Sequence, residues 1–470
     1  MSRLSAAIAA TRFGMGARPG EIADAADDPR GWLEAQIRTD AAVFPADGLQ
    51  STQDVFAARI ADAPMAGPRG AGEPDEETRQ AIQQRIQREA REGLRLEIEA
   101  RTRHAASTGS SFAERWARFW SNHFTVAARN AQMIGLVGPY EREAIRPHVF
   151  GRFSQLLGNA ILHPGMLIYL DAARSIGPST LPAQRRDAGL NENLAREILE
   201  LHTLGVGTGY TQVDIVEFAK ALTGWTVSGP QTARLAAAGR GGRAQDIATE
   251  PGRAIFAEPL HEPGTRTVLG KAHGGEGKLQ AASILDMLAT HPATARHVAT
   301  KLARHFVSDT PPQSAIAKLE TSFLSSNGDL AALARAVIHL DEAWVDEQQK
   351  FKTPEELLMS AARAAGAQAA FGGGQRQVYT SLAQAPFSAP SPAGWPDDVA
   401  AWSGADAIKK RLEWANAVSR RMARGSSPTD FLDAALGEMA GGRTRQAVGR
   451  AESAEQGFTL ALMAPEFQRR

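Results

Sequence analysis

The chain has 470 residues, 43% of them hydrophobic and 22% charged, a composition typical of folded globular proteins. Lys and Arg together number 52, as do Asp and Glu, so no net charge favours nucleic acid or an anionic membrane as a partner. Because the chain contains no cysteine, disulfides, thiolate metal ligands and a cysteine nucleophile are excluded.

The sequence shows no segment typical of membrane insertion or export. No apolar run approaches the ~20 residues that span a bilayer. In residues 1–16, Thr11 and Arg12 interrupt a short Ala/Ile stretch too early for the apolar part of a signal peptide. We therefore expect no membrane span and, by default, a cytoplasmic protein, with a periplasmic or exported location only if a leader was trimmed.

The elements predicted in chain order are mostly helices. Apolar residues recur at helical spacing, with capping residues or Gly and Pro at the ends, over 28–37, 76–106, 111–124, 152–170, 207–225, 278–340 and 405–470. Two Pro/Gly-rich stretches, 63–75 and 226–254, are predicted to be flexible loops. Short β-type runs predict a small β-hairpin near 254–270. The fold class expected is predominantly α, a multi-helix globular unit with one small β element.

The helix predicted over 191–205 (NENLAREILELHTLG) carries a carboxylate on its apolar side. At 100° per residue, Glu197 falls among the leucines and is expected to turn inward, with Asn193 and Glu200 at the edge of that face. An unpaired buried carboxylate costs several kcal/mol, so Glu197 must be neutral, paired or metal-bound. Those are also the states in which carboxylates take part in chemistry.

Two other predicted helices place a histidine on an apolar face. His123 lies on the aromatic face of 111–124, and His305 lies on the apolar stripe of 294–309. If the three helices meet, their inward polar groups form a cluster of two histidines and a carboxylate. Such a cluster has three interpretations: a site for a divalent metal such as Zn or Fe, an acid–base site, or a buried ion pair that fixes helix register.

A series of motifs follows along the chain: RFGMGARPGE, FWSNHFTV, HPGMLIYLD, NENLAREILELHTLGVGTGYTQVDIVEFAKALTGW, HEPGTRTVLG, LARHFVSDTPP, PAGWPDDVAAW and RLEWAN. In content and order they resemble the bacterial family called domain of unknown function 1800, over nearly the whole chain. One departure is HPGM, where the family pattern has HPAM. The resemblance implies one family-length unit over 1–470, and a sulfatase/phosphatase-like protein as a partner. The family motifs add His163, His202 and His261 to the candidate residues.

The leading hypothesis is a hydrolase-like enzyme acting on a small-molecule or polymer substrate. The catalytic residues expected are Glu197, Glu200, His202 and Arg196. Arg196 would bind an anionic group of the substrate. The metal ligands expected are His123, Glu197, His305 and His261. The competing hypothesis is a non-catalytic scaffold or assembly partner, whose buried Glu, His and Arg groups are structural ion pairs.

Overall fold

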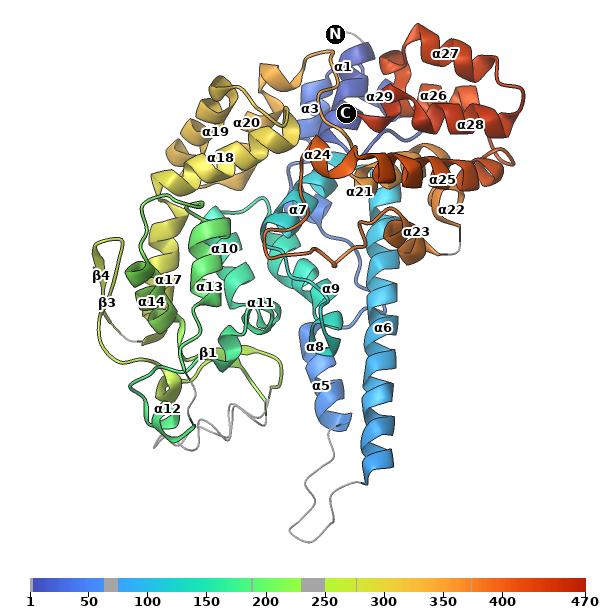
Figure 1. The fold of residues 1–470 in the computed structure, drawn as a ribbon. Helices are drawn as coiled ribbons and strands as arrows, with labels where there is room; N and C mark the ends of the chain where they lie inside the picture. The colour runs from blue at the N-terminus through green and yellow to red at the C-terminus, as the bar shows by residue number, and fades with distance from the viewer. Residues whose placement is uncertain (1–2, 63–74, 187–188, 230–249, 276, 373) are drawn as a thin grey trace.

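The computed structural model describes residues 3–62, 75–186, 189–229, 250–275, 277–372 and 374–470. Helices make up most of this part of the chain (Figure 1), which confirms the predominantly α fold class. Most of both predicted loops, 63–75 and 226–254, lies outside the described residues. None of the helices described is long and apolar enough to cross a bilayer.

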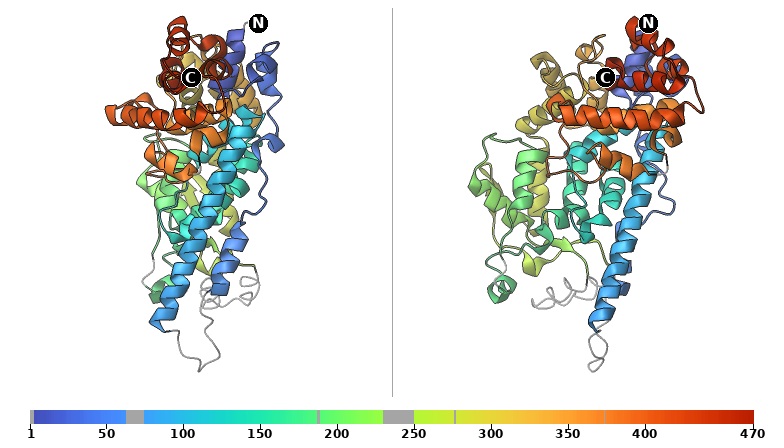
Figure 2. Two further views of the ribbon diagram at one scale, coloured as in Figure 1. Left: turned by 90° about the vertical axis from the view of Figure 1, so that its right-hand side faces the viewer. Right: turned by 45° about the vertical axis from the view of Figure 1, so that its right-hand side comes forward.

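The main helices of the first half include one long helix at the edge of the molecule (Figures 1 and 2). They are α1 (Arg3–Ile8), α2 (Glu21–Asp24), α3 (Pro29–Glu34), α4 (Thr39–Ala42), α5 (Thr52–Asp62), α6 (Glu76–Ser107), α7 (Ser111–His123), α8 (Ala131–Ile134), α9 (Val137–Tyr140), η2 (Glu141–Ile145), α10 (Phe153–Leu162), α11 (Pro164–Tyr169), α12 (Leu181–Arg186), α13 (Asn193–Glu197), η5 (Ile198–His202) and α14 (Gln212–Leu222). The long helix is α6, which begins at the cap formed by Asp75.

Helix α7 lies between the two halves of the molecule (Figure 1) and is buried on every side. Its aromatic face packs as predicted, with Trp116 and Trp120 fully enclosed. The face that carries Glu114, Arg115 and Arg118 is buried too, although its composition resembles a solvent-exposed face. A helix enclosed all round must pair these charges, because unpaired buried charges are strongly unfavourable.

The α-helices of the second half lie mostly in the upper part of Figure 1, whereas α17 lies in the lower part beside α14. They are α17 (Gly277–Ala289), α18 (Pro292–Phe306), α19 (Gln313–Ser325), α20 (Leu330–Ile338), α21 (Pro354–Ala365), α22 (Ala367–Phe371), α23 (Gln375–Ser381), α24 (Val399–Trp402), α25 (Ala405–Met422), α26 (Pro428–Leu436), α27 (Gly442–Gly449), α28 (Ala454–Met463) and α29 (Pro465–Gln468). One large cluster of buried apolar side chains extends from Ala7 to Phe467, so both ends of the described chain contribute to the same core.

The β structure differs in detail from the hairpin predicted near 254–270. Strand β2 (Ala254–Phe256) pairs with β1 (Trp225–Val227), and β3 (Arg266–Val268) pairs with β4 (Lys271–His273), both antiparallel. The two strands within the predicted segment therefore have partners outside it. Only β3 and β4 form a tight hairpin, whose turn contains Gly270 at positive φ.

Candidate active site

The helix that carries Glu197 does not keep the geometry assumed from the sequence. It is α-helical over α13 and continues as the π-helical turn η5. A π turn contains more residues than an α turn, so the face that follows Glu197 is rotated relative to an ideal α-helix. Glu197 is half-buried, while His202 is fully enclosed. The expectation that Glu197 is the enclosed polar group of this helix is therefore wrong.

The predicted catalytic group around Glu197 forms a partly exposed patch of charges. Burial and repulsion by Glu200 raise the pKa of Glu197, and Arg196 opposes them. Arg196 Nη1 lies 3.7 Å from Glu200 Oε1, and its Nη2 lies 3.1 Å from Glu192 Oε2. Arg196 thus already has two carboxylate partners on its own helix, an arrangement typical of surface ion pairs at i, i+4 spacing.

His123 and His202 bind each other's backbone. His123 Nε2 lies 3.1 Å from the carbonyl oxygen of His202, and His202 Nδ1 lies 3.0 Å from the carbonyl oxygen of His123. Since a carbonyl only accepts, each of these ring nitrogens must carry a proton and donate it. The pair ties α7 to η5.

A third histidine, which the sequence interpretation missed, joins the same region. His297 on α18 donates from Nε2 to the carbonyl oxygen of Leu201 at 3.0 Å. Burial, with Lys301 as the next cause, lowers the pKa of His202 to about 3 and that of His297 to about 4. The same two causes hold the pKa of His123 well below its usual range. All three rings are therefore neutral at neutral pH.

The four predicted metal ligands do not form one group. Within the described part of the chain, no three His, Asp or Glu side chains are arranged to hold a metal ion. His261 bonds the carbonyl oxygen of Thr223 at 2.8 Å, while His305 bonds Asp397 instead. His163, added from the motifs, caps α11 by accepting from the Gly165 amide at 3.0 Å. Each histidine contacts a different partner, so the predicted metal cluster is not formed.

The structure places a cavity of about 310 Å³ where α7, α18 and the start of α21 meet the segment 384–398. Many charged side chains line it. They are Arg101, Arg115, Arg118, Glu141, Lys301, Arg304, His305, Glu355, Glu356, Asp397 and Asp398. His123 and His305 are the two predicted site residues that line this cavity.

His305 and Asp397 form a close pair in the cavity wall. The distance from His305 Nδ1 to Asp397 Oδ2 is 2.6 Å, and the two residues lie 92 positions apart in the sequence. Nδ1 therefore carries the proton, which leaves Nε2 with its lone pair. Nε2 lies 3.4 Å from Arg115 Nη1, a long contact. Burial, together with Arg470 and Arg115, lowers the pKa of His305 although Asp397 raises it.

Asp397 is held in place by further cations. Lys350 Nζ lies 3.2 Å from Asp397 Oδ1 and donates to the Asp397 carbonyl oxygen at 2.7 Å. Arg470 donates from Nη1 to the carbonyl oxygen of His305 at 2.7 Å. Burial raises the pKa of Asp397, but His305 and Lys350 outweigh it, and the net shift is downward. Asp397 is thus a carboxylate that fixes the orientation of the imidazole.

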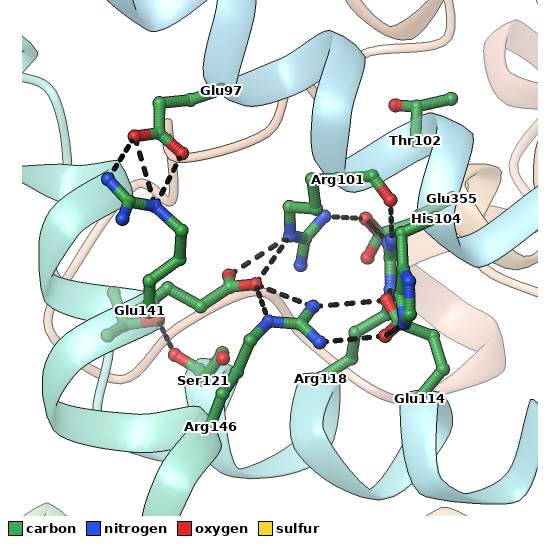
Figure 3. A network of polar contacts seen from close by, with 12 residues as sticks. Glu97, Arg101, Thr102, His104, Glu114, Arg118, Ser121, Glu141, Arg146 and Glu355 are labelled. Atoms are coloured by element: carbon green, nitrogen blue, oxygen red, sulfur yellow. Dashed lines mark hydrogen bonds and ion pairs between the residues drawn. The ribbon is translucent and has the colours of Figure 1, made fainter. Parts of the chain in front are cut away.

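A network of buried ion pairs, shown in Figure 3, lines another part of the cavity and extends behind it. It alternates three arginines and three glutamates, namely Arg101, Arg118, Arg146, Glu114, Glu141 and Glu355. Glu114 is fully enclosed between Arg118 Nε at 2.5 Å and Arg146 Nη1 at 2.8 Å. Burial opposes ionisation of Glu114, but Arg146 and Arg118 more than compensate, so its pKa is lowered. The network is electrically balanced.

A comparison with protein families identifies the chain. The model of the family described as "Protein of unknown function (DUF1800)" matches residues 8–469, so the chain belongs to that family. No curated protein and no solved structure matches it. The family resemblance inferred from the motifs is therefore confirmed, and an activity has to be argued from the cavity itself.

Proposed function

We propose that the protein is a hydrolase-like enzyme whose acid–base residue is His305, oriented by Asp397. The observation that supports this most is the 2.6 Å pair between the two side chains in the wall of a cavity. A neutral imidazole with one nitrogen fixed by a carboxylate and the other unprotonated is suited to general base catalysis. This proposal replaces Glu197 with His305 as the base.

The chemistry follows from the two ring nitrogens. Nε2 would accept a proton from water as the water oxygen attacks the substrate and displaces the leaving group, and the resulting imidazolium would be stabilised by Asp397 through Nδ1–H. Burial, with smaller contributions from Arg470 and from Arg115 beside Nε2, keeps the pKa of His305 low, so the base is unprotonated at neutral pH. The protonated ring then returns the proton to the leaving group.

The second candidate function is a non-catalytic scaffold. The balanced network around Glu114 supports it, because fully paired buried charges are what an architectural role requires (Figure 3). Under this alternative the His305–Asp397 pair is one more structural contact, and the cavity has no chemical use.

An activity screen separates the two functions. The protein is assayed against nitrophenyl esters, phosphates and glycosides, and the best substrate is used to compare variants. We expect His305→Gln to lower kcat by about 10²–10⁴-fold, the usual range for loss of a general acid or base. Asp397→Asn should lower kcat as well, because the amide no longer stabilises an imidazolium.

The matched control is His339→Gln. His339 is also a histidine paired with a carboxylate, Glu34 at 2.6 Å, but its side chain is half exposed and lies outside the cavity. We expect full activity in this variant. Equal turnover by the wild type and by His305→Gln contradicts the proposed function and favours the scaffold.

A further inference from the structure

The cations of the cavity fall into two groups. Arg101, Arg115 and Arg118 each form ion pairs with glutamates. Lys301 and Arg304 line the same cavity, yet neither forms an ion pair or a side-chain hydrogen bond within the described ranges. A protein interior normally satisfies its charges, so a partly buried lysine without an ion pair, with an arginine as its neighbour, is unusual.

The two unpaired cations lie beside the proposed base. Lys301, Arg304 and His305 are spaced i, i+3 and i+4 on α18 and therefore share one face of the helix. Arg304 is exposed, and Lys301 is partly buried. Burial lowers the pKa of Lys301 to about 8, with Asp397 opposing and Arg304 adding to the effect. An anion bound here would stabilise the charged form of this ammonium group.

Two polar atoms in this part of the cavity wall have no hydrogen-bond partner among the described residues. His123 is almost fully enclosed, and its Nδ1 has no hydrogen-bond partner among the described residues. Because Nε2 donates its proton to the His202 carbonyl, Nδ1 carries a lone pair and can only accept. Ser121 Oγ, also in the cavity wall, is likewise without a partner.

We propose that the cavity binds a hydroxylated organic anion. Lys301 and Arg304 bind its carboxylate or phosphate group, and His123 Nδ1 accepts a hydrogen bond from its hydroxyl. The ligand thereby supplies the negative charge that Lys301 and Arg304 lack and the hydrogen-bond donor that His123 Nδ1 lacks. This inference rests on the proposed function, because it names the substrate class on which His305 would act.

Calorimetric titration with three probes tests the proposal. Tartrate and succinate share a four-carbon dicarboxylate skeleton, and only tartrate carries hydroxyls; glycerol phosphate replaces the carboxylate by a phosphate. We expect tartrate to bind about fivefold or more tightly than succinate, the effect of one or two neutral hydrogen bonds. The tighter of tartrate and glycerol phosphate identifies the anionic group. Equal affinity for tartrate and succinate overturns the hydroxyl contact, and absence of binding by all three probes overturns the site.

Variants locate the bound anion. Lys301→Met and Arg304→Met should each weaken binding about tenfold, as expected for loss of a charge-assisted contact. Lys409→Met is the control, since Lys409 is a largely exposed lysine on α25 and lies outside the cavity. Wild-type affinity in both cavity variants overturns the anion site. The two proposals fail separately: His305→Gln that keeps turnover contradicts the acid–base role alone, whereas its loss of turnover with probe binding intact supports both.

Discussion

The two walls of the cavity differ in whether their charged side chains form ion pairs. On the α7 wall each charge of the Glu114 network has partners of opposite sign at ion-pair distance (Figure 3). On the α18 wall, Lys301 and Arg304 form no ion pair within the described residues, although the charge of Asp397 acts on Lys301. Paired charges hold helices in place, whereas unpaired charges and bare lone pairs raise the free energy of the empty protein and are characteristic of binding sites. We therefore assign a supporting role to the paired charges of the Glu114 network, and binding to the unpaired cations of α18 together with His123 Nδ1 at the end of α7.

Among single substitutions, the largest effect on stability is expected from breaking the supporting wall. Glu114→Gln removes the carboxylate that Arg118 and Arg146 share and leaves both guanidinium groups buried with less compensation. We expect the free energy of unfolding to fall by about 3–5 kcal/mol, the usual cost of removing one partner of a buried pair. Urea denaturation measures it. A loss below about 1 kcal/mol, typical of exposed pairs, would contradict the structural role of this wall.

The next effect is a loss of stability in acid, caused by the three histidines that link α7, η5 and α18. His123, His202 and His297 have lowered pKa values in the folded protein, so the unfolded chain binds protons first. Stability is fully present above about pH 6.5, the usual histidine pKa. Below that pH, the free energy of unfolding falls by up to about 1.4 kcal/mol per pH unit for each histidine. For His297 the loss continues to about pH 4, and for His202 to about pH 3.

Urea unfolding followed from pH 7.5 down to pH 4.5 measures this slope. His202→Gln should reduce it, whereas His339→Gln, at a half-exposed histidine, should leave it unchanged. A stability that stays flat between pH 6.5 and pH 5 would show that the three rings are not held neutral.

The smallest change in the free energy of unfolding is expected from a substitution on the α18 wall, and here the protein should become more stable. Lys301→Met removes a partly buried cation that has no ion pair among the described residues and leaves an apolar side chain of similar length. We expect the free energy of unfolding at neutral pH to rise by up to about 1 kcal/mol, as is common when a functional site is replaced by a packed one. Thermal or urea denaturation tests the sign. A clear destabilisation would indicate that Lys301 supports the fold.

Elements with strong local signals could be predicted from the sequence. The charged helix expected over 76–106 is α6, Glu76–Ser107. Thr211 caps α14 and forms a capping box with Asp214, as their spacing indicates. These features depend on residues within a few positions of each other, where helical periodicity and capping preferences act directly.

The site was less predictable because it depends on packing over long sequence distances. An amphipathic interpretation assigns Glu114 and Arg118 to solvent, yet α7 is enclosed on all sides. The π turn at Ile198–His202 breaks the periodicity used to place Glu197. Asp397 lies in a family motif, but no local pattern connects it to His305. One signal was available: Lys301, Arg304 and His305 share a helical face, which marks α18 as more than an apolar helix.

The protonation state of His305 is the most direct test of its proposed role as a general base. Long-range nitrogen–proton NMR spectra of protein labelled at histidine, assigned with His305→Gln, report which ring nitrogen carries the proton. At pH 8 we expect a neutral ring protonated at Nδ1, with Nε2 unprotonated, and a pKa of His305 below about 6.5. A ring protonated at Nε2, or one still doubly protonated at pH 8, would contradict the assignment of His305 as the base.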